Sequence, residues 1–348
     1  MILLLPTVAV EAGGRAAWMV AFISGFSGFL MLLLVGKLAQ RFPAKTFPTY
    51  ASEILGKWPG KILAFVMAVN FGLNASVDLG VAVKNLEGIY FVNTPPWVIA
   101  LILAVMALAT TWFGLVHASR LAPALLALLF LTFVLTFPLL WRWMKPGYLI
   151  PLFDVSQIDF GGKAFWVSMG VIRAALFPVV FLPYVKEPRK AIRTLAWAHW
   201  IGWVGNFLAV ITPVMVFGPA GARAISQPFP FVIAVLRVEN FPFERLEMLG
   251  RLAFHVNTVY AIACIYFTGG LFFADVFGVK SVRPFMPVMA GLSMAPLLLI
   301  PSAVRATEFA YGSVLRGLAA AGVTFPVLWV VYLLRGLHRK NRRAAAAQ

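Results

Sequence analysis

The sequence predicts an all-α membrane protein that crosses the bilayer many times. Of its 348 residues, 61% are apolar and only 12% are charged, about half the charged fraction of a typical soluble domain. The mean hydropathy is +0.90. A soluble domain of this length could not bury so much apolar surface, because the surface relative to the volume falls only slowly as a protein becomes larger. These values exclude a soluble enzyme and a disordered chain, and the single cysteine, Cys264, excludes a disulfide scaffold.

The predicted spanning helices are apolar runs of the length that crosses a bilayer, about 20 residues. They lie at residues 16–35, 60–83, 96–114, 121–140, 164–185, 195–217, 249–278, 284–301 and 310–334. A tenth apolar run, 1–10, is half as long. It has no basic residues before it and no small-residue cleavage site, so we interpret it as the second half of a helix rather than a signal peptide.

The positive charge predicts the orientation. The net charge is +17, which in a soluble protein would suggest a nucleic-acid partner. In a membrane protein, basic residues gather on the cytoplasmic side. Alternate connections and the tail carry the following basic residues: Lys37, Arg41, Lys45, Lys57, Lys61, Arg120, Lys186, Arg189, Lys190, Arg193, Lys280, Arg283, Arg335, Arg339, Lys340, Arg342 and Arg343. We therefore expect no nucleic acid, a cytoplasmic C-terminus, and a basic cytoplasmic tail at 336–348 that sets topology or contacts anionic lipid.

Two connections are predicted to contain helices that do not span the membrane. Segment 37–58 mixes polar and aromatic residues, which is typical of an interfacial helix lying along the bilayer. Segment 218–245 is rich in proline and phenylalanine. Its middle, Phe231 to Val238, is expected to form a short amphipathic helix over the outer face.

Prolines within two of the spans predict interrupted helices, since proline removes a backbone hydrogen bond. Span 164–185 contains Gly170, Pro178 and Pro183, and the run 1–10 also carries a proline. These two segments begin two halves of a single domain, 1–140 and 163–335, with five helices each. Interrupted helices at corresponding positions indicate an inverted-repeat transporter fold with a ligand at the midplane. The two halves share no repeat at the level of sequence.

Four stretches carry a resemblance to a known family. They are ILLLPTVAVEAGGRAAW at 2–18, KLAQRFPAKTFPTYASEILGKWPGKIL at 37–63, LPYVKEPRKAIR at 182–193 and FERLEMLGR at 243–251. In this order and spacing they resemble the B subunits of GerA-type spore germination receptors, or endospore germination permeases. That family is similar to the amino acid–polyamine–organocation transporters, so the resemblance implies a LeuT-like, five-plus-five bundle of ten helices.

The resemblance also implies a function and a location. It implies a subunit of a nutrient receptor in the inner membrane of a spore, which works with other receptor subunits and with membrane lipids. The ligand would be an amino acid or another small nutrient. Family members carry a cytoplasmic segment and the first half of a helix before the ILLLP stretch. We therefore expect either that the first helix is truncated in this chain or that the true start of the protein lies upstream. The alternative is a proton-coupled secondary amino acid transporter of the bacterial cytoplasmic membrane.

Polar side chains within the spans are the candidate ligand residues, because an ionisable group at the bilayer centre costs about 2.5–3.5 kcal/mol on insertion scales. Asn70, Asn74 and Asp78 are spaced by four residues and share one helix face. They form either one wall of a ligand path or hydrogen bonds between helices. Asp78 lies nearer the outer surface, where it either couples a proton or pairs with Lys84.

Other candidates lie in the interrupted helix and in the span 249–278. Arg173 follows the expected break and either binds a ligand carboxylate or makes a structural ion pair. Thr258 and Tyr260 either line the cavity or pack between helices, and His255 is a second possible proton-coupling group. A further stripe, formed by His199, Trp203 and Asn206, is interpreted as helix packing.

Backbone groups are expected to bind the ligand as well. In the inverted-repeat fold, the N-termini of half-helices point their positive dipole ends at a ligand carboxylate. This implicates Ile2, Leu3 and Leu4 in the first helix, and Gly170 and Val171 in the interrupted one. The sequence has no cluster of metal-binding residues, phosphate-binding loop or nucleophile elbow. We therefore expect neither a metal, a cofactor nor an enzymatic activity.

Overall fold

The computed structural model describes residues 4–42, 45–88, 90–173, 176, 180–185, 187–235, 246–300 and 303–336. Across these ranges every regular element is a helix and no strand occurs, as the sequence predicts. The α-helices are α1 (Leu5–Gly13), α2 (Ala17–Ala39), α3 (Phe47–Leu55), α4 (Lys57–Glu87), α5 (Pro96–Trp112), α6 (Leu115–Trp141), α7 (Lys163–Ser168), α9 (Pro188–Ala224), α10 (Pro228–Val235), α11 (Leu246–Phe277), α12 (Met286–Leu299) and α13 (Ala303–Leu334).

The helices confirm a multi-pass integral membrane protein. Among the described residues, six helical segments are long and apolar enough to cross a bilayer: Leu5–Ala39, Lys57–Glu87, Val116–Trp141, Lys190–Ala224, Leu252–Phe277 and Arg305–Leu334. Two shorter apolar helices, Pro96–Trp112 and Arg283–Leu299, accompany them. Each predicted span other than 164–185 therefore coincides with one helix, which is short for the spans 96–114 and 284–301.

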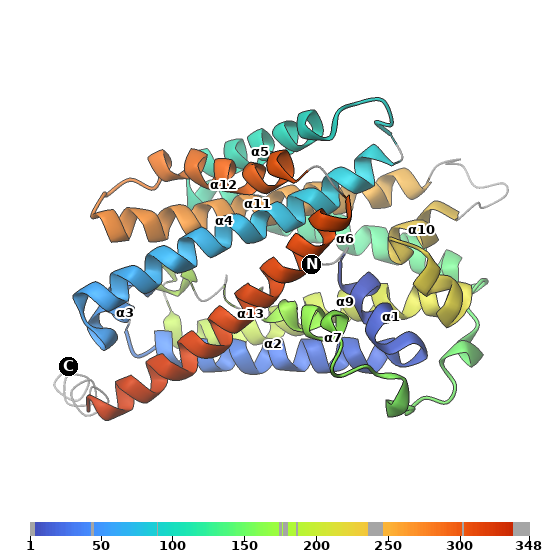
Figure 1. Ribbon diagram of the computed structural model, residues 1–348, viewed down its shortest axis with the longest axis horizontal. Coiled ribbons are helices and arrows are strands. Elements are labelled where there is room, and N and C mark those ends of the chain that lie inside the picture. The colour runs from blue at the N-terminus through green and yellow to red at the C-terminus, as the bar shows by residue number, and fades with distance from the viewer. Residues whose placement is uncertain are drawn as a thin grey trace.

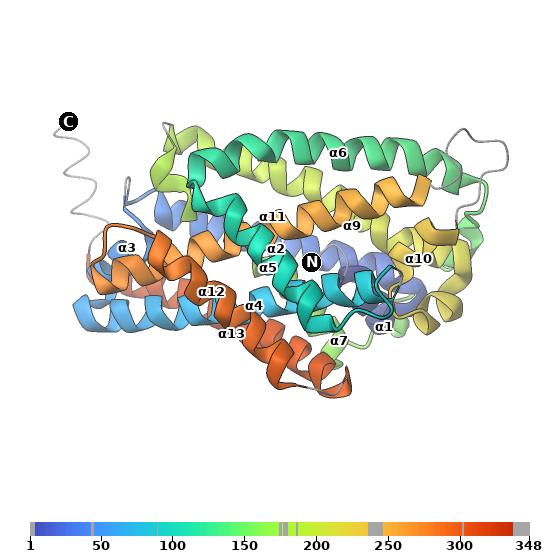
Figure 2. The same ribbon diagram turned by 90° about the horizontal axis from the view of Figure 1, so that it is seen from above.

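The bundle is built around α4 and α11, which are the most buried of the long helices. Helix α4 packs along α11, α12 and α3, and α13 crosses it diagonally (Figure 1). Seen from above, α6 forms one edge of the molecule, while α5 and α12 cover α4 (Figure 2). A second core joins α1, α2, α7 and α9. Helix α13 also packs against α7 and against the turn Met169–Val171 that follows it.

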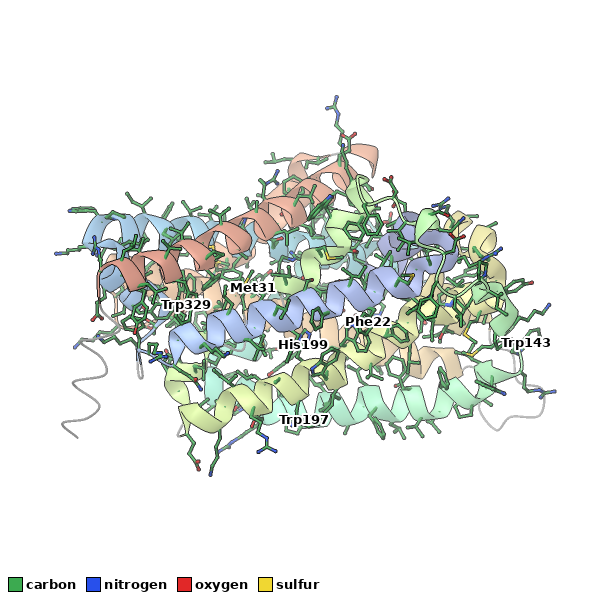
Figure 3. All side chains as sticks on the ribbon, turned by 90° about the horizontal axis from the view of Figure 1, so that it is seen from below. Phe22, Met31, Trp143, Trp197, His199 and Trp329 are labelled. Carbon is green, nitrogen blue, oxygen red and sulfur yellow. The ribbon has the colours of Figure 1, made fainter. Side chains whose placement is uncertain are left out.

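Helix α2 lies close against α9 because small residues line its contact face. A Cβ atom added at Gly25 would lie only 1.7 Å from Nε1 of Trp203. The indole N–H of Trp203 donates to the Ala21 carbonyl at 3.1 Å, and Nε2 of His199 lies 2.9 Å from the Gly25 carbonyl oxygen. Figure 3 shows His199 between the two helices. His199 and Trp203 of this stripe therefore pack between helices, whereas the Asn206 amide donates to the Gly202 carbonyl of its own helix.

The span 164–185 is interrupted, as its glycine and prolines predict. Helix α7 ends at Ser168 and continues as a 3-10 turn over Met169–Val171, and a second 3-10 turn covers Leu182–Tyr184. The hydroxyl of Ser24 on α2 donates to the Ser168 carbonyl at 2.6 Å, which satisfies one of the carbonyls freed at the end of α7. Pro178 lies outside the described residues.

The first helix and the two connecting helices differ from the prediction in their boundaries. Helix α1 begins at Leu5, beside a proline in its first turn, and ends at Gly13, which is followed by Gly14 with a φ of +51°. Helix α2 runs on to Ala39, so the predicted interfacial helix 37–58 is shortened to α3. The outer helix α10 begins at Pro228, three residues before the predicted start, and residues 236–245 lie outside the described part.

Candidate functional site

A central cavity of about 180 Å³ lies between α4, α11, α13 and the segment that follows the break in 164–185. The residues that line it are Met67, Asn70, Phe71, Asn74, Asp78, Arg173, Leu176, Ala261, Cys264, Ile265 and Gly317. The polar members come from α4 and from Arg173, and most of the remaining wall is apolar. The cavity thus has one charged, hydrogen-bonding side and one hydrophobic side.

The polar side is a chain of hydrogen bonds that links two separate segments. The Arg173 guanidinium donates through Nη1 to Oδ1 of Asn74, and through Nε to the Gly170 carbonyl at 3.4 Å. The Asn74 amide in turn donates to Oδ1 of Asn70 at 2.6 Å. Arg173 and Asn74 are both buried. The chain therefore fixes the guanidinium at the wall of the cavity.

Asp78 supplies the opposite charge in the same cavity. Its carboxylate interacts electrostatically with the Arg173 guanidinium. Lys84, the neighbour expected from the sequence, lines a different cavity. Because water is largely excluded here, the two charges act on each other and on a ligand more strongly than they would in bulk water.

Gly317 on α13 closes the cavity over this hydrogen-bonded chain. A Cβ atom at Gly317 would lie 3.1 Å from Nδ2 of Asn74 and 3.2 Å from Cδ of Arg173. Such contacts are tighter than ordinary van der Waals distances. Only glycine therefore lets α13 approach without moving the polar side chains.

Helix α11 forms much of the apolar wall, through Ala261, Cys264 and Ile265. The sequence-predicted residues Thr258 and Tyr260 do not line the central cavity. The Thr258 hydroxyl donates to the Phe254 carbonyl of its own helix at 2.9 Å. Tyr260 interacts with the thiol of Cys264, one turn further along α11.

The remaining predicted residues lie at different distances from the central cavity. Gly170 and Val171 are buried in the 3-10 turn before Arg173, and Gly170 takes part through its carbonyl. His255 is buried on α11 but does not line the cavity. Leu4 precedes α1 and lines a second cavity, whereas Ile2 and Leu3 lie outside the described residues.

An aromatic cluster closes the end of the central cavity that faces α3. Phe47, Tyr50, Phe272 and Phe325 surround a gap of about 10 Å³. This gap shares Met67, Phe71 and Leu176 with the central cavity. The rings of Phe47 and Phe272 stack with centroids 5.2 Å apart. The packed rings therefore separate the central cavity from the α3 end of the bundle.

The central cavity places a cation and a carboxylate where a small molecule that carries both charges could contact them. Among the described residues, no group of three or more His, Cys, Asp and Glu side chains is placed to hold a metal. Sequence reasoning identified Asn70, Asn74, Asp78 and Arg173 through their charge and helical spacing. It missed Gly317 and Cys264, whose small side chains carry no signal until α11 and α13 are placed.

Comparison with known proteins assigns the family. The family model described as spore germination protein matches residues 1–304. The spore germination protein YndE of Bacillus subtilis (strain 168) is 22% identical over 322 residues, which cover 88% of this chain and 83% of that protein. Spore germination protein B2 of the same organism is 19% identical over 269 residues, 76% of this chain and 71% of that protein. With this match along most of its length, the chain belongs to the spore germination protein family.

Proposed function

We propose that this protein is the nutrient-sensing, permease-like subunit of a spore germinant receptor. An amino acid or similar small nutrient binds in the central cavity, and occupancy triggers germination without any reaction being catalysed. The observation that carries the proposal is that a cation, Arg173, and a carboxylate, Asp78, line the same cavity within the helix bundle. A ligand carboxylate pairs with the guanidinium, and a ligand ammonium group pairs with the carboxylate, each by charge-assisted hydrogen bonds.

The size and the apolar wall of the cavity narrow the ligand class. Pockets for drug-sized ligands occupy roughly 300–1,000 Å³, and this one has about 180 Å³. Met67, Leu176 and Ile265 are among the apolar side chains that line the rest of the cavity. The proposed ligand is therefore a small zwitterion with a short apolar side chain, held at its charged end by Arg173 and Asp78.

The relatives support the biological setting of this proposal. Both are named as spore germination proteins. We place the protein in the inner membrane of the spore with its C-terminus in the cytoplasm, in contact with other receptor subunits and membrane lipids. We further propose a five-plus-five bundle, with repeats at 1–140 and 163–335.

Germination of spores that lack the gene tests the proposal, nutrient by nutrient, together with uptake of each nutrient by growing cells. The proposal predicts loss of the germination response to one nutrient, with its uptake unchanged. Normal germination with lost uptake would contradict it. Restoring the gene with Arg173→Gln should recover the response only at higher nutrient concentrations, while restoring the unaltered gene should recover it fully.

A proton-coupled amino acid transporter is the second candidate. It is favoured by one observation, the protonatable carboxyl of Asp78 in the wall of the central cavity. His255 is a less direct proton carrier, since it is separated from the cavity lining. A transporter predicts nutrient accumulation against a gradient, abolished by Asp78→Asn, whereas a receptor subunit predicts no accumulation in either form.

A further inference from the structure

A second, larger cavity lies beside the central one and has no role in the proposed nutrient site. This lateral cavity has a volume of about 510 Å³, within the range of about 300–1,000 Å³ typical of ligand pockets. It is enclosed by the C-terminal half of α4, the N-terminus of α5, the C-terminus of α12 and the N-terminal part of α13.

The lateral cavity opens toward the hydrocarbon of the membrane. Two of its lining side chains, Trp97 and Leu298, are 52% and 59% exposed on the outside of the bundle. The next residue, Leu299, is 77% exposed. In a spanning protein, apolar side chains exposed on the flank of the bundle contact lipid. A molecule in the membrane could therefore enter the cavity sideways.

The lining is mainly apolar. Its uncharged polar members are Ser76, Thr307 and Tyr311, and its charged residues stand at one end. Val77, Val81, Leu297, Phe309 and Ala310 are among the aliphatic and aromatic side chains that form its wall. The charged lining residues are Lys84 and Glu87, three residues apart on the last turns of α4. Residues at this spacing lie on the same helix face.

The charged end lies at the level of the lipid headgroups. Lys84 and Glu87 are close to the end of a spanning helix, and Trp97 stands at the start of the next one. Tryptophan is enriched at this depth in membrane proteins. The cavity thus combines a long apolar compartment with a headgroup-level pair of opposite charges.

We propose that the lateral cavity binds one membrane phospholipid with an amine-bearing zwitterionic headgroup, a phosphatidylethanolamine. An acyl chain fills the apolar compartment. The headgroup phosphate pairs with the Lys84 ammonium, and the headgroup ammonium pairs with the Glu87 carboxylate. An anionic headgroup such as phosphatidylglycerol has no cation for Glu87, so the pair selects against it.

Photocrosslinking tests the proposal. The full-length protein is reconstituted into phosphatidylglycerol nanodiscs that contain a small fraction of phosphatidylethanolamine or phosphatidylglycerol with a diazirine on the acyl chain, and crosslinked peptides are mapped by mass spectrometry. We expect crosslinks from phosphatidylethanolamine to concentrate on the peptides of α4 and α13 that line the cavity. Equal labelling by the two lipids, spread around the bundle, would show ordinary surrounding lipid and overturn the proposal.

Two kinds of variant separate the acyl-chain site from the headgroup site. Ala306→Trp fills the cavity from α13 and should lower cavity crosslinking about tenfold, a change that corresponds to about 1.4 kcal/mol. Ala124→Trp makes the same replacement on the exposed face of α6 and should leave cavity crosslinking unchanged. Unaltered crosslinking in Ala306→Trp would contradict the acyl-chain site.

The headgroup variants test the proposal even if the Ala306→Trp protein does not fold. Lys84 is exposed and Glu87 is partly exposed, so Lys84→Gln and Glu87→Gln should preserve the fold. Each should reduce the preference for phosphatidylethanolamine over phosphatidylglycerol. An unchanged preference in both variants would contradict the headgroup assignment. None of these changes touches the central cavity, so the result is independent of nutrient binding.

Discussion

The guanidinium of Arg173 donates a hydrogen bond to the side-chain carbonyl of Asn74, and this bond joins the interrupted segment to α4 at the wall of the central cavity. A buried charge that loses its partner is costly, so any event that draws Arg173 toward a ligand must also alter the bond to α4. Ligand binding and the packing of these two segments are thereby linked through one side chain.

The first prediction concerns the charge at Arg173. Arg173→Gln removes the cation proposed to hold the ligand carboxylate. The nutrient concentration for half-maximal germination should rise about tenfold or more, since hydrogen bonds to charged groups contribute about 1.5–3 kcal/mol. Arg173→Lys keeps the charge but loses the planar fork and should give an intermediate value. Spores with equal amounts of each variant in the membrane supply the measurement, and a wild-type dose response in Arg173→Gln would contradict the assignment.

The second prediction separates ligand binding by Asp78 from a merely structural ion pair with Arg173. If Asp78 holds the ligand ammonium group, Asp78→Asn should weaken the nutrient response by itself. The double variant, which also carries Arg173→Gln, should then respond to the nutrient no better than the more impaired of the two single variants. If Asp78 only neutralises Arg173, the double variant should recover toward the wild-type response. Germination dose responses for the two single variants and the double variant provide this double-mutant cycle.

The third prediction uses a matched pair of glycines on α13. Gly317→Ala places a methyl group against the Asn74 and Arg173 side chains. Overpacking typically costs 1–3 kcal/mol, so the nutrient response should weaken about tenfold or more. Gly322→Ala makes the same change where no atom lies within 4 Å of the added carbon, and it should behave like the wild type. Equal dose responses for the two variants would show that α13 does not constrain the polar chain.

The fourth prediction concerns the fold rather than the ligand site. Gly25→Ala directs a methyl group into the indole of Trp203. Separating α2 from α9 should destabilise the protein by about 1–3 kcal/mol or more. Gly202→Ala on α9, where the added carbon meets no atom within 4 Å, is the control. Thermal unfolding of the purified proteins in detergent should show a lower Tm for Gly25→Ala alone.

Much of the fold could be predicted from the sequence because membrane spans obey a strong length and hydropathy constraint. Helix boundaries were less predictable. Helix α2 extends past the last apolar residue of its span as far as Ala39, since nothing in Gly36 or Lys37 ends a helix. Helix α10 begins at Pro228 because proline suits the first turn of a helix.

The candidate site was predictable only where charge made residues conspicuous. Arg173 and Asp78 stand out in apolar spans, and the spacing of Asn70 and Asn74 places them on the same face. Thr258 appeared equally suitable, yet its hydroxyl is bonded to its own helix. Gly317 becomes significant only through the crossing of α13 over α4, which depends on tertiary packing rather than on local pattern.

Chemical labelling of Cys264 tests the central claim most directly, because the chain has one cysteine and it lines the central cavity. A small thiol-reactive reagent is applied to membranes that contain the protein, with each amino acid in turn. The relevant nutrient is the one to which spores that lack the gene no longer respond. The account predicts that this nutrient, at about ten times its dissociation constant, slows the modification of Cys264 about tenfold. Modification at the same rate with and without that nutrient would contradict binding in the central cavity.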